Sequence, residues 1–174
     1  MQTLLNPAVE DVWAWLADVE DPEIPALSVV DLGIVRDIQW SSDPAGAECV
    51  VTITPTYSGC PATDTIAQSI RDTLLRHGVT RSKLVTRISP AWTTEWLSAD
   101  AHRKLRDYGI APPVAHLIPI SAIGRGPRPA LLPVACPRCA SERSELTSQF
   151  GSTPCKALYR CLDCLEPFDL FKCH

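Results

Sequence analysis

Two pairs of cysteines near the C-terminal end place the strongest constraint on what this chain can fold into. Cys136 and Cys139 form one C-x2-C pair, Cys161 and Cys164 form a second, and 21 residues separate the pairs. Each pair turns two thiols toward one point, and two such turns supply the four sulfurs of a tetrahedral metal site. We therefore predict that these four cysteines bind Zn²⁺, with iron in the same sulfur geometry as the alternative.

The residues between and after the pairs predict a small β-domain around this metal. Residues 145–150 and 156–160 have strand composition and are joined at a Gly-Ser-Thr-Pro turn, and residues 168–171 supply a third strand. A domain of about forty residues buries too little core to be stable alone, so the metal is expected to be required for folding. Sulfur fills all four positions, which favours a structural over a catalytic ion. We assign residues 134–174 to a zinc ribbon.

A proline-rich segment precedes the ribbon and predicts a domain boundary. Residues 111–133 contain six prolines and two glycines, which is typical of a linker. Within it, residues 114–120 are apolar enough to pack against a domain. The chain is thus expected to hold a first domain over residues 1–110, a linker, and the ribbon.

The first domain combines helical and strand patterns. Helical spacing or caps predict helices over residues 7–18, 61–77 and 98–108, with Trp13 in the core. Strands are predicted over residues 34–40, 49–54 and 83–88, the first two as a hairpin. The expected fold class is therefore α+β, with a small mixed sheet followed by the β ribbon.

Cys60 is the main candidate for chemistry in this domain. It lies in Gly59-Cys60-Pro61, between a predicted strand and a predicted helix. Proline suits the first helical position, which would place Cys60 near the N-cap, where unpaired backbone N–H groups favour a thiolate. We predict a nucleophile or a soft metal ligand; the alternative is a buried cysteine that acts as a small apolar residue.

Two further groups of residues carry weaker signals. Asp21 and Glu23 stand in an Asp-Pro-Glu-Ile-Pro turn, where they could bind a metal or orient a thiol, although spacing alone favours an exposed acidic turn. Cys155 and Cys173 lie outside the C-x2-C pairs. They could form a second soft-metal site, pair with Cys60 in a redox reaction, or be structural.

Charge and hydropathy narrow the class of protein. The chain has 174 residues and a net charge of −4, with an excess of nine negative charges in residues 1–60 and of five positive charges thereafter. This asymmetry favours protein partners or self-association as a homodimer, or simply two solvated faces, and the acidic total argues against nucleic-acid binding. No apolar run is long enough for a membrane span and the N-terminus has no secretory signal. We expect a cytoplasmic location.

Several motifs together resemble a known family. The first half is similar to the iron–sulfur assembly domain family that includes SufT and the cytosolic iron–sulfur targeting factors, through Asp21-Pro22-Glu23-Ile24-Pro25, Asp31-Leu32-Gly33-Ile34-Val35, Thr52-Ile53-Thr54-Pro55-Thr56 and Gly59-Cys60-Pro61. With the ribbon, the 151–161 segment and the terminal Phe171-Lys172-Cys173-His174, nearly the whole chain resembles the PaaD family of phenylacetate degradation. The resemblance implies that Cys60 is the reactive cysteine and that Asp21 and Glu23 are its acidic motif.

The resemblance also implies partners and cargo. Members of the PaaD family are encoded with the phenylacetyl-CoA epoxidase, which has a di-iron oxygenase component and a reductase that carries flavin and a [2Fe–2S] cluster. The function expected from it is an accessory protein that matures the iron or iron–sulfur centre of the epoxidase, with a transient iron or cluster, no independent enzymatic activity, and iron–sulfur assembly proteins as further partners. A non-catalytic structural subunit of the epoxidase is the alternative.

Other functions fit the residues less well. No histidine follows a glutamate by three residues, so the chain has no Glu-x-x-His pair for a di-iron site of its own. No local motif supplies a histidine partner for Cys60, which disfavours a cysteine hydrolase. A zinc-ribbon nucleic-acid binder is disfavoured by the net charge.

Overall fold

A computed structural model describes residues 6–43, 46–57, 59–113 and 133–172. These residues fall into two compact units that divide between Lys104 and Leu105. Most of the predicted linker, including the apolar 114–120 stretch, lies outside the described residues, as do Cys173 and His174. The domain boundaries predicted from the sequence therefore remain a proposal, and each unit is described by itself.

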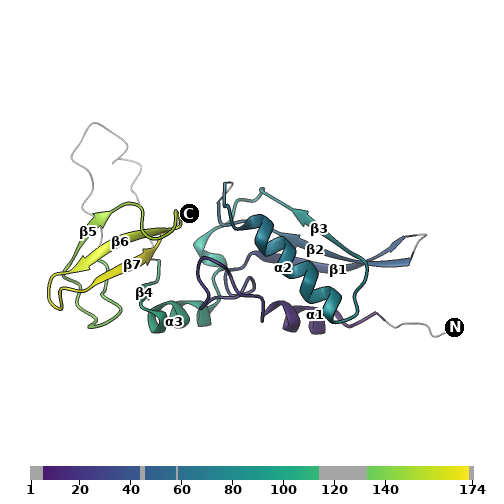
Figure 1. Cartoon of the computed structure of the whole chain (residues 1–174), viewed down its shortest axis with the longest axis horizontal. Helices are drawn as coiled ribbons and strands as arrows, with labels where there is room; N and C mark the ends of the chain where they lie inside the picture. The colour runs from purple at the N-terminus through teal and green to yellow at the C-terminus, as the bar shows by residue number, and fades with distance from the viewer. Residues whose placement is uncertain (1–5, 44–45, 58, 114–132, 173–174) are drawn as a thin grey trace. The chain divides into compact units, whose positions relative to one another are not determined.

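The first unit is built on a three-stranded mixed sheet (Figure 1). The strands β1 (Val35–Asp43), β2 (Gly46–Ile53) and β3 (Ser82–Thr86) follow one another in that order across the sheet. β1 is antiparallel to β2 as the predicted hairpin requires, whereas β3 is parallel to β2. The parallel pair is connected through α2 (Thr63–Arg76), because parallel neighbours need a crossover that is usually helical.

Two helices cover one face of this sheet. Alternation along β2 buries Cys49, Val51 and Ile53 on that face. α2 packs on it with the apolar stripe predicted from its sequence, formed by Ala62, Ile66, Ile70 and Leu74. α1 (Val9–Leu16) adds Val12 and Leu16, but Trp13 is only half-buried, because it stands at the edge of the buried stripe.

The segment after β3 packs against the turn before β1 through Trp92. Trp92 is buried and its Nε1 donates to the carbonyl oxygen of Leu32 at 2.7 Å. A short 3-10 turn, η1 (Thr94–Trp96), leads to α3 (Ala99–Tyr108). Ser98 caps α3 as predicted, since its Oγ accepts the N–H of Ala101 at 3.0 Å.

The second unit is a four-stranded sheet (Figure 1). The predicted strands are present as β5 (Ser144–Ser148), β6 (Lys156–Cys161) and β7 (Pro167–Phe171), which pair antiparallel. A fourth strand, β4 (Ile110–Ala111), pairs parallel to β7 and was not predicted. The core of the unit consists of Ala111, Val134, Cys136, Ala157, Tyr159, Cys161, Phe168 and Leu170.

Candidate metal centre and the Cys60 site

The fold brings the four C-x2-C cysteines of the second unit to one point. The Sγ atoms of Cys136, Cys139, Cys161 and Cys164 all lie within 4.8 Å of one another. The Sγ atoms of Cys136 and Cys164 are 3.7 Å apart, and those of Cys139 and Cys161 are 3.6 Å apart. A tetrahedral ion with metal–sulfur bonds of about 2.3 Å requires sulfur–sulfur separations of about 3.8 Å. The arrangement therefore fits a sulfur-ligated metal ion.

Each C-x2-C turn ends in the same strained backbone conformation. Ala140 follows Cys139 with φ 60°, and Leu165 follows Cys164 with φ 64°. Side chains disfavour this left-handed region, so the two equivalent positions carry strain that the turns impose. In the first turn this conformation occurs together with a hydrogen bond from the N–H of Ala140 to the carbonyl oxygen of Cys136, at 2.8 Å.

The electrostatics of the cluster favour a bound cation. The backbone N–H of Cys164 donates to Cys161 Sγ at 3.5 Å and lowers the pKa of Cys161 to about 6. Although the Glu166 backbone N–H acts in the opposite direction, burial and the neighbouring thiols, that of Cys161 above all, raise the pKa of Cys164 to about 12. Closely spaced sulfurs cannot all carry negative charge unless a positive ion lies between them.

A surface clasp joins the two metal-binding turns. Ser141, beside the first turn, donates from Oγ to Asp163 Oδ2 in the second turn. Arg143 Nη1 reaches Asp163 Oδ1 at 2.7 Å, and the Arg143 carbonyl oxygen accepts the N–H of Leu162 at 2.8 Å. The ion pair is exposed and contributes little stability by itself. Together these contacts link the two turns and so help to fix the position of one cysteine pair relative to the other.

Cys60 lies two residues before the N-cap of α2. α2 begins at Thr63 with Ala62 as its N-cap, so Cys60 is not at the N-cap and Pro61 is not the first helical residue. Instead Cys60 is part of a turn, in which its N–H donates to the Tyr57 carbonyl oxygen at 3.2 Å and its own carbonyl oxygen accepts Thr63 Oγ1 at 2.9 Å. The prediction that the N-terminus of α2 favours a thiolate at Cys60 assumed that Cys60 lies next to the first helical residue, and it does not.

The thiol of Cys60 borders a very small apolar cavity. The side chain is half-buried, and its Sγ has no hydrogen-bond partner in the described part of the chain. The cavity measures about 10 Å³ and is lined by Ile34, Ile53, Pro55, Thr56, Cys60, Thr63 and Ile66. This is at most the space of one water molecule. A metal or cluster on Cys60 would have to bind on the solvent side of the sulfur.

The acidic turn is organised by Asp21 itself. Asp21 is buried, and its Oδ1 accepts the backbone N–H groups of Glu23 at 2.8 Å and Ile24 at 2.9 Å. The exposed acidic turn favoured from the sequence is therefore wrong for Asp21, whose carboxylate is used to close the turn. Within the described ranges, Asp21, Glu23 and Cys60 do not form a three-ligand group.

The remaining cysteines give no second metal site in the part of the chain that the structure describes. Cys49 is fully buried in the sheet core, and burial raises its pKa to about 11. Cys155 is buried in the second unit, with its Sγ 3.1 Å from Thr153 Oγ1. Cys173 lies outside the described residues, so a site or a redox pair that includes it stays a prediction.

Sequence reasoning missed a buried carboxylate, Asp31. Its Oδ2 accepts Ser28 Oγ at 3.0 Å and Lys104 Nζ at 2.7 Å, while its Oδ1 accepts Ser98 Oγ at 3.1 Å. Burial acts to raise the pKa of Asp31, but the Lys104 ammonium and the Ser28 hydrogen bonds hold it below its usual value. Asp31 thereby fixes the start of α3 on the turn that precedes β1.

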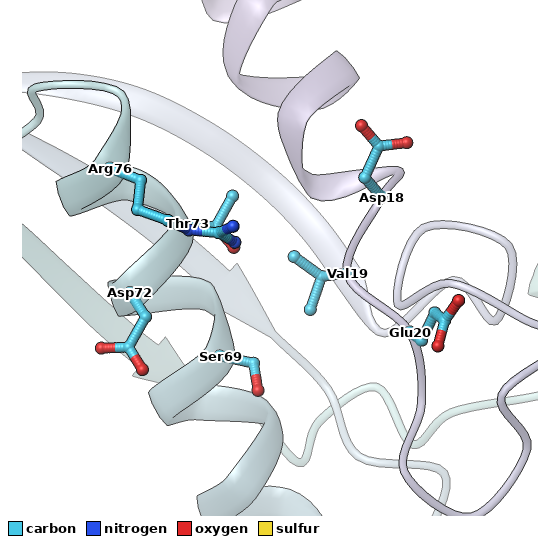
Figure 2. A pocket seen from close by; sticks show the side chains of 7 residues that line it. All are labelled: Asp18, Val19, Glu20, Ser69, Asp72, Thr73 and Arg76. Atoms are coloured by element: carbon cyan, nitrogen blue, oxygen red, sulfur yellow. The ribbon is translucent and has the colours of Figure 1, made fainter.

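A polar depression lies elsewhere on the first unit (Figure 2). It is lined by Asp18, Val19 and Glu20 after α1 and by Ser69, Asp72, Thr73 and Arg76 of α2. In Figure 2 the carboxylates of Asp18, Glu20 and Asp72 point in different directions, so they do not converge on a ligand. None of the site residues predicted from the sequence lines it.

Among the described residues no helix is long and apolar enough to cross a membrane.

The fold and the cysteine site define the class of protein: an α+β domain followed by a four-cysteine β-ribbon. Two family models match it. The one described as iron–sulfur cluster assembly protein matches residues 9–81, and the one described as PaaD zinc beta ribbon domain matches residues 126–172. The chain is also 46% identical to an Escherichia coli K12 protein that is named a putative 1,2-phenylacetyl-CoA epoxidase subunit, over 99% of this chain and 98% of that one. The chain belongs to the PaaD family.

Two further matches each cover about half of the chain. A Porphyromonas gingivalis protein named Fe-S protein maturation auxiliary factor is 33% identical over 55% of this chain and 89% of its own length. A crystal structure of a domain of unknown function, DUF59, from Bacillus anthracis is 28% identical and superposes with a TM-score of 0.50 over 55% of this chain and 89% of that one. The family resemblance seen in the sequence motifs is therefore confirmed.

Proposed function

We propose that this chain is an accessory protein of a phenylacetyl-CoA epoxidase and that it matures an iron or iron–sulfur centre of that enzyme. The likeness to the Escherichia coli epoxidase protein over almost the full length supports the link to the epoxidase. The likeness of about half of the chain to an Fe-S protein maturation auxiliary factor, and the match of residues 9–81 to an iron–sulfur cluster assembly model, support the maturation role. The expected recipients are the reductase and oxygenase components.

For the ribbon we propose a resident Zn²⁺ on Cys136, Cys139, Cys161 and Cys164. Zinc supplies charge neutralisation and a fixed tetrahedral link between the two turns, and no redox chemistry. Four sulfur ligands leave no open coordination position, which supports a structural role over a catalytic one. Iron in the same geometry is the alternative, because the sulfur spacing suits both ions.

For the first unit we propose that Cys60 is the thiol that holds the cargo. Its sulfur is half-buried and has no hydrogen-bond partner in the described residues, so it is free to bind iron or a cluster at its exposed side. Thiolate sulfur is the usual ligand of such centres. The single observation that carries this assignment is the contrast with Cys49, which is fully buried. Asp21 and Glu23 would shape the neighbouring turn rather than complete a ligand set.

The second candidate is a non-catalytic structural subunit of the epoxidase. It is favoured by one observation: among the described residues, Cys60 has no nearby carboxylates, histidines or thiols that complete a three-ligand group. A cluster carrier with a single thiol needs ligands from elsewhere, for example from a second copy or from the recipient, whereas a structural subunit needs none.

The deciding experiment compares epoxidase components made with and without this chain. We expect the reductase to lack iron–sulfur cluster, or the oxygenase to lack iron, when the chain is absent or carries Cys60→Ser. Chemical reconstitution of the missing centre should then restore epoxidation without this protein. The matched control is Cys49→Ala, which alters the sheet core and leaves the Cys60 thiol in place.

Two outcomes would overturn the proposal. If Cys60→Ser leaves both components fully loaded with metal, the thiol is not the carrier. If fully loaded components still need this chain during every turnover, the structural subunit is the correct function.

A further inference from the structure

The proposed function assigns no role to the open edge of the first sheet. Among the described residues, β3 is paired with β2 on one side and with no strand on the other. Such an edge presents unpaired backbone N–H and C=O groups to solvent. It is a potential docking site for another extended segment.

The ladder with β2 identifies which groups are open. The N–H of Arg87 donates to the Ile53 carbonyl oxygen at 2.8 Å, and the Arg81 carbonyl oxygen accepts the Cys49 N–H at 3.0 Å. In a parallel pair the bonded residues alternate, so the odd-numbered residues of β3 face β2. The backbone groups of Ser82, Leu84 and Thr86 therefore point to the open side.

The side chains along this edge are basic. Between Asp72 and Glu95 the chain has four arginines or lysines and no acidic residue, although the protein as a whole is acidic. Lys83 and Arg87 are exposed, and neither forms an ion pair within the described ranges. Unpaired cations on an edge strand select for a partner segment that carries carboxylates.

The register of β3 fixes the pattern of that partner. Strand alternation places Lys83, half-buried Val85 and Arg87 on the sheet face opposite to the one that α2 covers, because Leu84 is level with buried Val51. Lys83 and Arg87 are about 13 Å apart along an extended strand. A complementary strand would present acidic, apolar and acidic side chains at alternate positions on this face.

We propose that β3 is a docking edge for an acidic extended segment of a partner protein, which adds to the sheet as a further strand beside β3. Backbone hydrogen bonds to Ser82, Leu84 and Thr86 would supply the pairing. Lys83 and Arg87 would select the charge and the register. The proposal does not depend on Cys60 or on the ribbon metal, so it can fail or succeed separately from the maturation role.

The probe is a fluorescein-labelled peptide of sequence Thr-Glu-Thr-Val-Thr-Glu-Thr, titrated with the full chain at low salt. The register control, Thr-Glu-Glu-Val-Thr-Thr-Thr, has the same composition and charge but places its two acids on opposite faces. We expect binding of the first peptide to be at least tenfold tighter than of the control, and to weaken with added salt. Amide protection on binding should appear at Leu84 and Thr86.

Two variants separate charge from backbone pairing. Lys83→Glu with Arg87→Glu should weaken binding at least tenfold. Thr86→Pro removes an N–H that faces the open side and spares the β2 ladder, so it should abolish binding while the sheet stays folded. The backbone spectrum of each variant checks the fold, and Thr65→Ala on the exposed face of α2 is a control that should bind as the parent does.

Several results would overturn the proposal. No binding at millimolar peptide would mean that the cations only keep edges apart, and equal binding of both peptides would mean that Lys83 and Arg87 do not select a register. A stronger interaction with a single-stranded oligonucleotide that survives Thr86→Pro would identify a phosphate-binding patch. A concentration-dependent dimer that Thr86→Pro abolishes would make a second copy of the chain the occupant.

Discussion

In the second unit two of the four clustered cysteines are part of the hydrophobic core, whereas in the first unit the candidate thiol, Cys60, lies outside the core. Cys136 and Cys161 are buried among the core residues of the ribbon, and their partners Cys139 and Cys164 face solvent. Cys60 is half-buried in the turn before α2 and is not among the buried core residues. We therefore expect metal binding to be coupled to folding in the ribbon, and loss of the Cys60 thiol to leave the first unit folded.

The largest expected effect is on the ribbon after loss of its metal. A strong chelator, or Cys161→Ser, should remove an apparent stabilisation of about 10–16 kcal/mol and unfold residues 133–172 together with β4. The first unit should keep its native exchange protection. Hydrogen exchange read by mass spectrometry measures both units in the same sample. Persistent protection of β6 and β7 without metal would show that the ribbon does not need the metal to stay folded.

The next effect is on the stability of the first unit, where a glycine allows two segments to lie in close contact. Gly33 has φ +63°, and a Cβ there would lie 2.5 Å from the Trp96 carbonyl oxygen. We expect Gly33→Ala to destabilise the first unit by about 3 kcal/mol. Gly78→Ala, at φ +83° with open space around it, is the matched control. It should cost only about 1 kcal/mol.

Urea unfolding of the metal-loaded chain measures both variants. Metal content should be unchanged in each, because neither glycine belongs to the ribbon. Equal stability losses for Gly33→Ala and Gly78→Ala would show that the contact with Trp96 is not required.

A third effect distinguishes the units by their response to acid. Because the folded pKa of Asp31 is lowered, its contribution is present above the unfolded pKa of about 4 and is lost as pH falls through the folded value below it. Asp31→Asn should cost about 2 kcal/mol at neutral pH and flatten this dependence. Exchange protection of α3, followed from neutral pH to acid, tests the sign. An unchanged acid response in Asp31→Asn would exclude Asp31 as its source.

A smaller effect should appear at the strained turns of the metal centre. Ala140→Gly and Leu165→Gly each relieve a left-handed conformation of the folded turns, so each should stabilise the folded, metal-bound ribbon by about 1 kcal/mol or less and tighten metal binding accordingly. The measurement is the metal-binding midpoint in a competition with a chromophoric chelator. Ala135→Gly, outside the turns, should give no gain. Weaker metal binding by both turn variants would contradict the strain argument.

The smallest effect on stability is expected at Cys60. Cys60→Ser should change the free energy of unfolding by less than about 0.5 kcal/mol, since the position is half-exposed. In the parent chain Cys60 should react with iodoacetamide much faster than Cys49, which is fully buried and whose pKa is raised to about 11. Mass spectrometry of timed samples resolves the two sites. Equal rates would remove the distinction between them.

The parts that could be predicted from the sequence are those with local patterns. The C-x2-C spacing identified the four sulfurs that converge, and the α2 stripe identified the face of the helix that is buried. The helix begins at Thr63, two residues later than predicted, because the turn closed by the Cys60 carbonyl and Thr63 comes before it. Local composition contains no signal for such a turn.

The parts that could not be predicted depend on contacts distant in sequence. Asp31 meets Lys104 only after β3 and the Trp92 segment have folded back onto the turn before β1. β4 is two residues long and stands next to prolines, and its partner in β7 is far along the chain. Neither feature leaves a periodic pattern in the residues around it.

β4 has a consequence for how the family can vary. β4 and β5 belong to one sheet, so the chain between them connects two strands of the same sheet. Doubling the length of a flexible loop costs only about 0.6 kcal/mol in closure entropy. Natural relatives should therefore tolerate insertions and deletions between residues 114 and 132 without any change in the spacing of the strands around the metal. Even one residue gained or lost between Gly109 and Ala111 should be far less acceptable.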